Sequence, residues 1–249
     1  MRLDKYLLSQ GLAESRSKAV HLIKTGQIRV NDSVCTKQSY KVKASDLVEA
    51  KSPFKYVSRA GYKMEATFMT HDLNVKGLNV LDIGCSTGGF SDFFLQEGAA
   101  KVVGLDVALD CVDRKLLKDP RFSFMGGANA CDVKSLESRI GGERFDLIST
   151  DVSNSLLEEV LPKAGAFLKR GGLLVALFKP PYEVDRRIRS DEEMEGLTRE
   201  FDSWLLEGYE IVHKDLSPIK GGSKNKGTME VVYVLRLIAT ADPGSSEYL

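Results

Sequence analysis

The chain has 249 residues, of which 43% are apolar and 28% are charged, and its formal net charge is zero. These values are typical of a globular protein with one large domain or two smaller ones, and the longest apolar runs fall far short of the ~18 residues of a membrane-spanning helix. The four cysteines form no Cys-x-x-Cys pair, which argues against a zinc site or a disulfide scaffold. The first residues lack the apolar core of a signal peptide, so we expect a cytoplasmic protein with no metal and no membrane partner.

The zero net charge conceals an uneven distribution of charge. Residues 1–63 contain 13 Lys and Arg against 5 Asp and Glu, a net charge of +8, and the remainder of the chain carries −8. A basic N-terminal segment indicates a polyanionic partner such as nucleic acid, although a solvated charged surface would give the same count.

The first fifty residues predict a small module of helices followed by strands. Apolar residues recur at helical spacing, Ser15 has the position of a helix N-cap, and Gly26 has that of a left-handed helix exit. The predicted elements are a helix from Leu3 that stops at Gly11, a helix over residues 16–25, a strand over 28–30, a turn at Asn31-Asp32, and short strands near residues 34 and 47–49.

Three segments of this module, RLDKYL at residues 2–7, SRSKA at 15–19 and IKTGQIRVN at 23–31, resemble the S4 RNA-binding domain. The resemblance implies an RNA-facing surface, whose basic side chains would bind RNA through phosphate and ribose contacts. For some of these side chains, an ordinary surface charge is the alternative. The candidates are Arg2, Lys5, Arg16, Lys18, Lys24 and Arg29.

The chain beyond this module divides into three parts. Residues 51–61 include a proline and break the pattern, so we expect a linker there between a first domain at residues 1–50 and a second domain at residues 62–238. Residues 239–249 contain a Pro-Gly-Ser-Ser run and are expected to form a flexible tail.

The second domain is organised around the segment VLDIGCSTGGF at residues 80–90. It predicts a strand that ends near Asp82, a tight glycine turn and a helix. The glycines are not spaced as G-x-G-x-x-G and no Gly-Lys-Ser/Thr follows them, which favours a nucleoside ligand without a triphosphate. The segment resembles motif I of S-adenosylmethionine-dependent methyltransferases, and an unrelated glycine-rich turn of an α/β protein is the alternative.

Strands and helices alternate after this turn. Such alternation predicts a Rossmann-like α/β fold with a mostly parallel sheet, and the polar connection before the last strand predicts that this strand is antiparallel. We expect strands at residues 101–107, 122–125, 145–150, 173–178, 209–215 and 231–237, and helices at residues 62–69, 111–118, 135–140, 155–168 and 192–206.

Five charged residues fall at the carboxyl edge of the predicted sheet, where ligands bind in such folds. Asp82, Asp106, Asp151 and Lys179 end strands, and Glu230 precedes the antiparallel last strand. Asp106 lies about twenty residues after the glycine turn, where an acidic side chain can bind ribose hydroxyls. One carboxylate there would more often be a helix cap or surface charge, but five charges on one rim indicate a site.

Four residues resemble the Lys-Asp-Lys-Glu tetrad of FtsJ-like RNA 2′-O-methyltransferases: Lys63 in RAGYK, Asp151 in TDVS, Lys179 in LFKP and Glu230 in GTME. An S4 module before such a core resembles the TlyA, or hemolysin A, family of ribosomal RNA methyltransferases. The resemblance implies S-adenosylmethionine as cofactor and methyl transfer to the 2′-hydroxyl of a cytidine ribose in ribosomal RNA.

The resemblance also implies roles for individual residues. Because the hydroxyl must lose its proton as the methyl group arrives, a general base is required. Lys179, crowded by the ammonium of Lys63 and partly desolvated, is our candidate base, and Asp151 and Glu230 would hold the geometry. Cofactor binding is predicted for Asp82, Gly84, Ser86, Thr87, Gly88, Gly89, Phe90, Asp106, Val107, Asn129, Ala130 and Asp151.

The chain departs from the family pattern at three positions, of which the first two bear on the target nucleotide and the third on a loop contact near the adenine. Asn154 stands where an aromatic residue is common, Pro181 replaces a glutamine, and Cys131 replaces an arginine. The rival functions are a non-catalytic RNA-binding or ribosome-assembly factor, a pore-forming hemolysin and a small-molecule methyltransferase. The intact tetrad argues against the first, the lack of long apolar spans against the second, and the basic module against the third.

Overall fold

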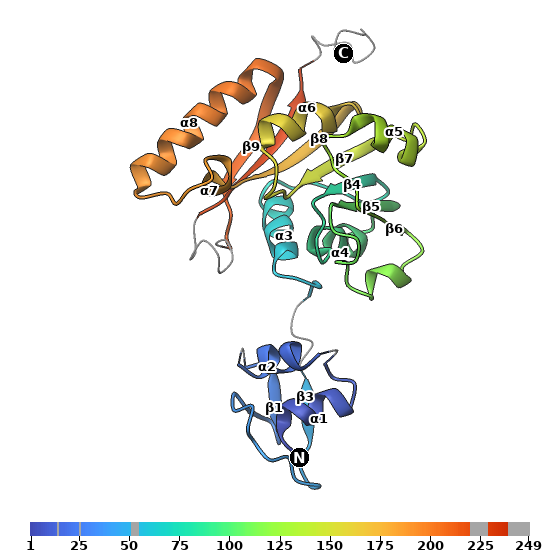
Figure 1. Ribbon diagram of the computed structural model, residues 1–249, viewed down its shortest axis with the longest axis vertical. Coiled ribbons are helices and arrows are strands. Elements are labelled where there is room, and N and C mark those ends of the chain that lie inside the picture. Colours follow the sequence, from blue (N-terminus) through green and yellow to red (C-terminus); the bar gives the residue numbers. More distant parts are fainter. Residues whose placement is uncertain (14, 25, 51–54, 220–228, 239–249) are drawn as a thin grey trace. The chain divides into compact units, whose positions relative to one another are not determined.

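The structure is a computed structural model that describes residues 1–13, 15–24, 26–50, 55–219 and 229–238. The chain divides into two compact units, Met1–Lys55 and Tyr56–Leu249 (Figure 1). The tail expected at residues 239–249 and residues 51–54 of the expected linker lie outside the described residues.

The first unit packs two helices on a small antiparallel sheet. Its elements are α1 (Leu3–Ser9), α2 (Arg16–Lys24), β1 (Ile28–Val30), β2 (Ser33–Val34) and β3 (Val48–Ala50), with strand order β2-β1-β3. The predicted N-cap is confirmed, because the Lys18 N–H donates to Ser15 Oγ over 3.1 Å. Leu3, Leu7, Ile23 and Ile28 form its buried core.

The described part of the second unit contains a seven-stranded sheet of order β6-β5-β4-β7-β8-β10-β9. The strands are β4 (Asn79–Ile83), β5 (Lys101–Asp106), β6 (Phe122–Gly126), β7 (Phe145–Thr150), β8 (Leu168–Phe178), β9 (Tyr209–Leu216) and β10 (Val231–Leu237). β10 is antiparallel to both of its neighbours, whereas β4 to β8 pair in parallel. The predicted α/β fold with a mostly parallel sheet and an antiparallel last strand is confirmed.

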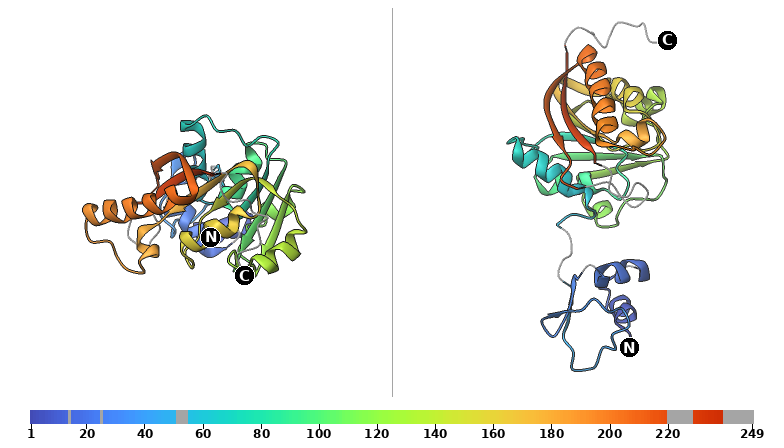
Figure 2. Two further views of the ribbon diagram at one scale, coloured as in Figure 1. Left: turned by 90° about the horizontal axis from the view of Figure 1, so that it is seen from above. Right: turned by 90° about the vertical axis from the view of Figure 1, so that its left-hand side faces the viewer.

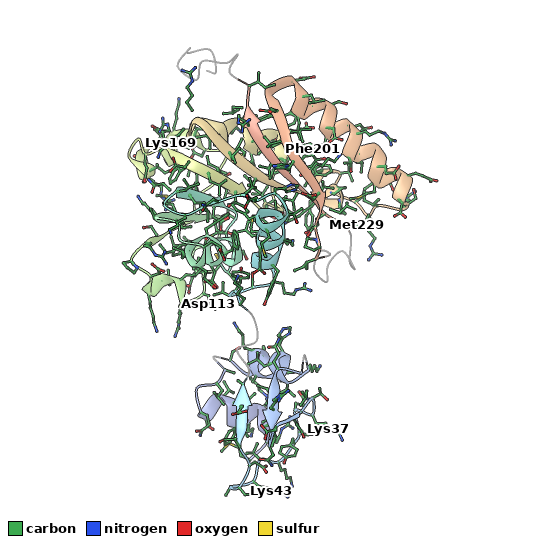
Figure 3. The ribbon with its side chains drawn as sticks, turned by 180° about the vertical axis from the view of Figure 1, so that it is seen from behind. Lys37, Lys43, Asp113, Lys169, Phe201 and Met229 are labelled. Carbon is green, nitrogen blue, oxygen red and sulfur yellow. The ribbon has the colours of Figure 1, made fainter. Side chains whose placement is uncertain are left out.

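Helices cover both faces of this sheet (Figure 2). They are α3 (Ala60–Thr70), α4 (Gly89–Gln96), α5 (Val133–Ile140), α6 (Leu157–Gly165), the short α7 (Pro180–Glu183) and α8 (Asp191–Gly208). α3 and α4 contribute to one buried cluster, and α5, α6 and α8 contribute to another on the opposite face. In the second cluster the rings of Phe178 and Phe201 stack with their centroids 4.3 Å apart, and Figure 3 labels Phe201 on α8.

Two predicted helices are wrong in part. Of residues 111–118, only Leu116–Lys118 are helical, as the 3-10 helix η1. The Asp113 N–H donates to the Thr87 carbonyl over 3.1 Å, and its carboxylate accepts from the Lys115 N–H over 2.9 Å. These contacts divert the backbone from helical pairing.

The helix predicted over residues 155–168 is shorter at both ends. α6 spans Leu157–Gly165, and Leu168 already pairs with Phe145 as the first residue of β8. The loop of residues 151–156, which precedes α6, is therefore longer than expected. The short helix α7 after β8 had no predicted counterpart.

Candidate active site

The turn between β4 and α4 depends on glycine because two chain segments meet there. Gly84 has a φ of +75°, and a Cβ at this position would lie 2.5 Å from the Asp151 carbonyl oxygen. A Cβ on Gly88 would lie 2.1 Å from Leu116 Cδ1. Larger residues would push the turn away from β7 and η1, so the glycines set how closely the turn and Asp151 approach.

Asp82 is fully buried beneath this turn and orders it. One carboxylate oxygen accepts from the Ser91 N–H and hydroxyl over 3.0 and 2.6 Å, and the other accepts from the Ser149 hydroxyl over 2.8 Å. Burial raises the pKa of Asp82 to about 6. Asp82 therefore supports the site from within the fold.

A cavity of about 220 Å³ opens at the carboxyl edge of the sheet. Seven of the twelve predicted cofactor residues line it: Gly84, Ser86, Asp106, Val107, Asn129, Ala130 and Asp151. The other five, Asp82, Thr87, Gly88, Gly89 and Phe90, are not among its lining residues.

Asp106 is anchored at this cavity by two backbone groups. Its oxygens accept from the Ser86 N–H over 2.8 Å and from the Ala108 N–H over 2.9 Å. Each oxygen keeps a further lone pair for a ligand hydroxyl. The side chain is half-buried at the wall, as expected for a group that holds a ribose.

The tetrad residues form two lysine–carboxylate pairs. Lys63 on α3 donates to Glu230, and Lys179 pairs with Asp151. Both lysines and Glu230 are buried, and Asp151 is half-buried. Because Val231 pairs with Phe178 across the sheet, Glu230 and Lys179 lie beside each other at its edge.

Lys179 has further contacts that restrain it. Its Nζ donates to Ser153 Oγ over 3.2 Å and to the Val152 carbonyl over 3.4 Å, and it lies 5.4 Å from the centroid of the Tyr182 ring. The sequence indicated the pairing residues but gave no sign of Ser153 or Tyr182. The loop after β7 thus contacts Lys179 and also lines the cavity.

Glu183 is a functional candidate that the sequence reasoning missed. Its carboxylate accepts from the Leu157 N–H at the start of α6 over 3.2 Å. Burial raises the pKa of Glu183 to about 7. Glu183 therefore ties α7, directly after Lys179, to the end of the loop that lines the cavity. The signal available in the sequence was its place four residues after Lys179.

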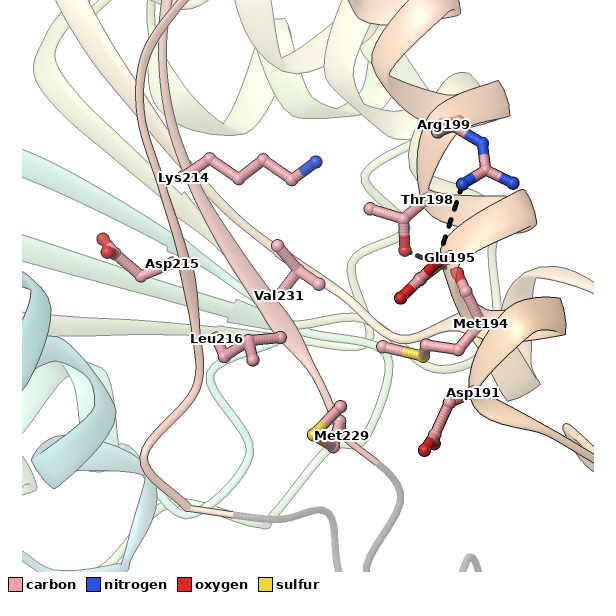
Figure 4. A pocket seen from close by; sticks show the side chains of 10 residues that line it. All are labelled: Asp191, Met194, Glu195, Thr198, Arg199, Lys214, Asp215, Leu216, Met229 and Val231. Atoms are coloured by element: carbon pink, nitrogen blue, oxygen red, sulfur yellow. Dashed lines mark hydrogen bonds and ion pairs between the residues drawn. The ribbon is translucent and has the colours of Figure 1, made fainter.

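A second cavity of about 360 Å³ lies between α8 and strands β9 and β10 (Figure 4). Met194 and Thr198 come from the helix, and Met229 and Val231 come from the chain around the start of β10. None of the predicted site residues lines it. Side chains alternate along an extended chain, so Met229 and Val231 face away from the side that Glu230 occupies.

The six basic candidates of the first unit have different surroundings. Arg2 and Arg16 form ion pairs with Asp4, which is completely buried. Lys5, Lys24 and Arg29 have exposed or half-buried side chains, as has Lys18. The structure thus brings the side chains of Arg2 and Arg16 together at the Asp4 carboxylate.

The sheet order, the glycine turn and the acidic residue at the end of β5 are typical of the α/β folds that bind nucleosides at the carboxyl edge of the sheet. A family model described as FtsJ-like methyltransferase matches residues 56–226, and an S4 domain model matches residues 1–48. The chain belongs to the FtsJ-like methyltransferase family and carries an S4 domain in front of the methyltransferase unit.

Individual relatives agree with this assignment. Hemolysin A of Brachyspira hyodysenteriae is 36% identical over 233 residues, which cover 90% of this chain and 96% of that protein. The 16S/23S rRNA (cytidine-2'-O)-methyltransferase TlyA of Mycobacterium tuberculosis is 34% identical over 187 residues, or 74% of this chain and 69% of that protein. A solved structure from Streptococcus thermophilus, provisionally described as a hemolysin, has a TM-score of 0.70 at 29% identity and covers 96% of this chain and 89% of that chain.

The hemolysin names raise the question of a membrane. Across residues 1–13, 15–24, 26–50, 55–219 and 229–238, no helix combines the length and apolarity needed to cross a bilayer.

Proposed function

We propose that this protein transfers a methyl group from S-adenosylmethionine to the 2′-hydroxyl of a cytidine ribose in ribosomal RNA. The observation that carries the proposal is the pairing of Lys63 with Glu230 and of Lys179 with Asp151, of which Asp151 lines the 220 Å³ cavity. Membership of the FtsJ-like family and the similarity to an rRNA cytidine-2'-O-methyltransferase support the same reaction.

The cavity suits a nucleoside cofactor. Asp106 can accept hydrogen bonds from ribose hydroxyls, and Gly84 keeps the adjoining wall free of a side chain. Val107 and Ala130 add apolar surface beside the amide of Asn129. The volume is somewhat below the roughly 300–1,000 Å³ of complete ligand sites, so it would enclose part of the cofactor. S-adenosylmethionine supplies a methyl group made electrophilic by its sulfonium.

Lys179 is the group that we assign to remove the hydroxyl proton. Ser153 and the Val152 carbonyl restrain its Nζ. Lys179 must first release its own proton to solvent, and as the neutral amine it then takes the proton of the 2′-hydroxyl. Its ion-pair partner Asp151 holds Nζ in place and stabilises the ammonium that this transfer forms. Proton transfer to a positioned base contributes about 10²- to 10⁴-fold to a rate.

The second pair is assigned to orientation of the ribose. Lys63 uses one of its three N–H groups on Glu230 and can donate another to a substrate oxygen. Pairing also compensates the cost of burying the ammonium and the carboxylate. Correct orientation of the attacking oxygen is worth up to about 7–11 kcal/mol in such reactions.

The direct test supplies purified full-length protein, S-adenosylmethionine labelled in its methyl group, and purified ribosomal subunits. We expect label in RNA, recovered as 2′-O-methylcytidine after digestion to nucleosides. Label on a base, or on ribosomal protein, would overturn the proposed reaction. Calorimetry that detects no binding of S-adenosylmethionine would instead favour a non-catalytic RNA-binding factor.

A further inference from the structure

Asp4 is a completely buried carboxylate in the first unit. It lies in the first turn of α1, and its side chain has no exposed area, whereas the Arg2 and Arg16 side chains that pair with it are 40% and 63% exposed. A buried carboxylate is costly unless cations and hydrogen bonds compensate it. Asp4 has both, from the residue just before α1 and from the first residue of α2.

The hydrogen bonds fix the orientation of each guanidinium. Arg2 donates from Nε and Nη2 to the two Asp4 oxygens over 3.0 and 3.1 Å, in the forked geometry of a bidentate pair. Arg16, the first residue of α2, donates from Nε to Asp4 Oδ2 over 3.3 Å. These contacts use two of the five N–H donors of Arg2 and one of those of Arg16. The remaining donors belong to two exposed cations that share one anchor.

We propose that Asp4 is a positioning residue that holds Arg2 and Arg16 as a preformed guanidinium pair for the phosphate backbone of RNA. The inference rests on the proposed function, because it assumes that the first unit binds ribosomal RNA. Guanidinium groups recognise phosphate with paired donors, and fixing them beforehand reduces the side-chain entropy lost on binding. The Arg2 guanidinium also holds the pKa of Asp4 below its usual range, so the anchor stays charged at neutral pH.

The test uses the fact that a charge effect and a positioning effect of Asp4 predict opposite changes in RNA affinity. Removing a negative charge from an RNA-binding unit should strengthen binding if charge alone matters. If Asp4 positions the arginines, Asp4→Asn weakens binding to purified ribosomal subunits about tenfold and lowers its dependence on salt concentration. The matched control is Asp32→Asn, which removes the same charge from an exposed turn position of the same unit with a φ of +62° that asparagine tolerates. We expect the control to bind as tightly as the wild type or more tightly.

A double-mutant cycle separates positioning from damage to the fold. In full-length protein carrying Arg2→Ala and Arg16→Ala, the further change Asp4→Asn should have no effect on binding, because Asp4 acts only through these two side chains. Arg2→Lys with Arg16→Lys keeps both charges but loses the fork, so we expect a loss similar to that of Asp4→Asn. The double lysine variant keeps both cations beside Asp4 and therefore keeps the inference testable if Asp4→Asn is poorly folded.

The outcomes distinguish this inference from the proposed function. A wild-type protein that methylates ribosomal RNA, together with an Asp4→Asn variant that binds equally well or better, would overturn the inference alone. The inference would also be overturned if Asp4→Asn weakened RNA binding by the same factor in protein that already carries Arg2→Ala and Arg16→Ala. Binding that depends on Asp4, in a protein that leaves no methyl group on RNA, would support the inference and overturn the proposed function.

Discussion

The two units of the chain use paired charges in opposite ways. In the first unit one buried carboxylate, Asp4, holds two exposed arginines. In the second unit Lys63 and Lys179 are themselves buried, and each has its own carboxylate. An exposed cation keeps its charge available to an external anion, whereas a buried, neutralised pair holds atoms in place. The contrast teaches that burial decides what such a pair can do: exposed cations around a buried carboxylate suit the proposed binding at a surface, and buried pairs suit the proposed proton transfer inside a site.

The largest effect is expected from breaking a buried pair. Lys179→Ala removes the assigned base and leaves Asp151 without its partner, so methyl transfer should fall about 10²- to 10⁴-fold. Lys169→Ala is the matched control. Lys169 is an exposed lysine near the start of β8, far along the strand from Lys179, and it pairs with Asp146 on β7. The rate of methyl transfer to ribosomal subunits measures both. Full activity of Lys179→Ala would end its assignment as the base.

The next largest effect is expected at Gly84, in the turn that lies against Asp151. Gly84→Ala places a Cβ 2.5 Å from the Asp151 carbonyl oxygen at a φ of +75°. We expect a loss of about 2–4 kcal/mol in the free energy of unfolding, from the backbone conformation and the clash together. Binding of S-adenosylmethionine should fall as well, which calorimetry measures.

Gly171→Ala measures the part of that stability loss that comes from the backbone conformation alone. Gly171 has a φ of +78°, and its Cβ would meet no atom within 4 Å. The loss should therefore be about 1–2 kcal/mol, with cofactor binding unchanged. Denaturant unfolding measures both variants. Equal losses in the free energy of unfolding would show that the close approach of Gly84 to the Asp151 carbonyl does not matter for stability.

A smaller effect follows from the pKa of Glu183, which burial raises to about 7 from its ordinary value of 4.5. Between these values the folded protein binds more protons at Glu183 than the unfolded chain, so its contribution to stability is present at low pH and is lost as the pH rises to about 7. Glu183→Gln keeps an acceptor oxygen and removes this titration. After allowance for partial exposure to solvent, the variant should gain about 1–2 kcal/mol relative to wild type between pH 5 and pH 8.

Denaturant unfolding of both proteins at the two pH values measures this difference. Asp82 also titrates near pH 6, but it is common to both proteins and cancels in the comparison. A difference between wild type and Glu183→Gln that stays constant with pH would contradict the raised pKa.

The smallest effect is expected from an exposed pair. Arg236 donates to Glu210 over 2.7 Å across β9 and β10, and both side chains are about half exposed. Arg236→Ala should change the free energy of unfolding by less than about 1 kcal/mol, because water screens such pairs. A loss as large as that of Gly84→Ala would remove the distinction between buried and exposed charges.

The sequence predicted those features that follow from strand order. Asp106 ends a parallel strand, Asp151 and Lys179 directly follow two others, and the carboxyl ends of such strands meet at one edge. Glu230 was placed there by the antiparallel direction of β10, which the structure confirms. The partners within the tetrad required the structure, because Lys63 could have paired with either carboxylate.

Other features depended on contacts that leave no pattern in the chain. Asp82 sits in the glycine motif, yet its carboxylate is buried and hydrogen-bonded to Ser91 and Ser149. Glu183 and Leu157 are 26 residues apart, and no periodicity connects them. The helix predicted from residue 111 failed because Asp113 bonds to the glycine turn, a contact fixed only when the sheet is assembled.

The bond between Lys63 and Glu230 joins residues 167 positions apart. During synthesis, the contacts within the first unit can form once residue 55 has been added, but the Lys63–Glu230 pair cannot form until residue 230 has been added. At about 5–20 residues per second, this interval lasts on the order of 10–35 seconds. The nascent chain therefore gains its basic S4 surface well before it gains the complete tetrad. The order of the two domains along the chain determines this order of events.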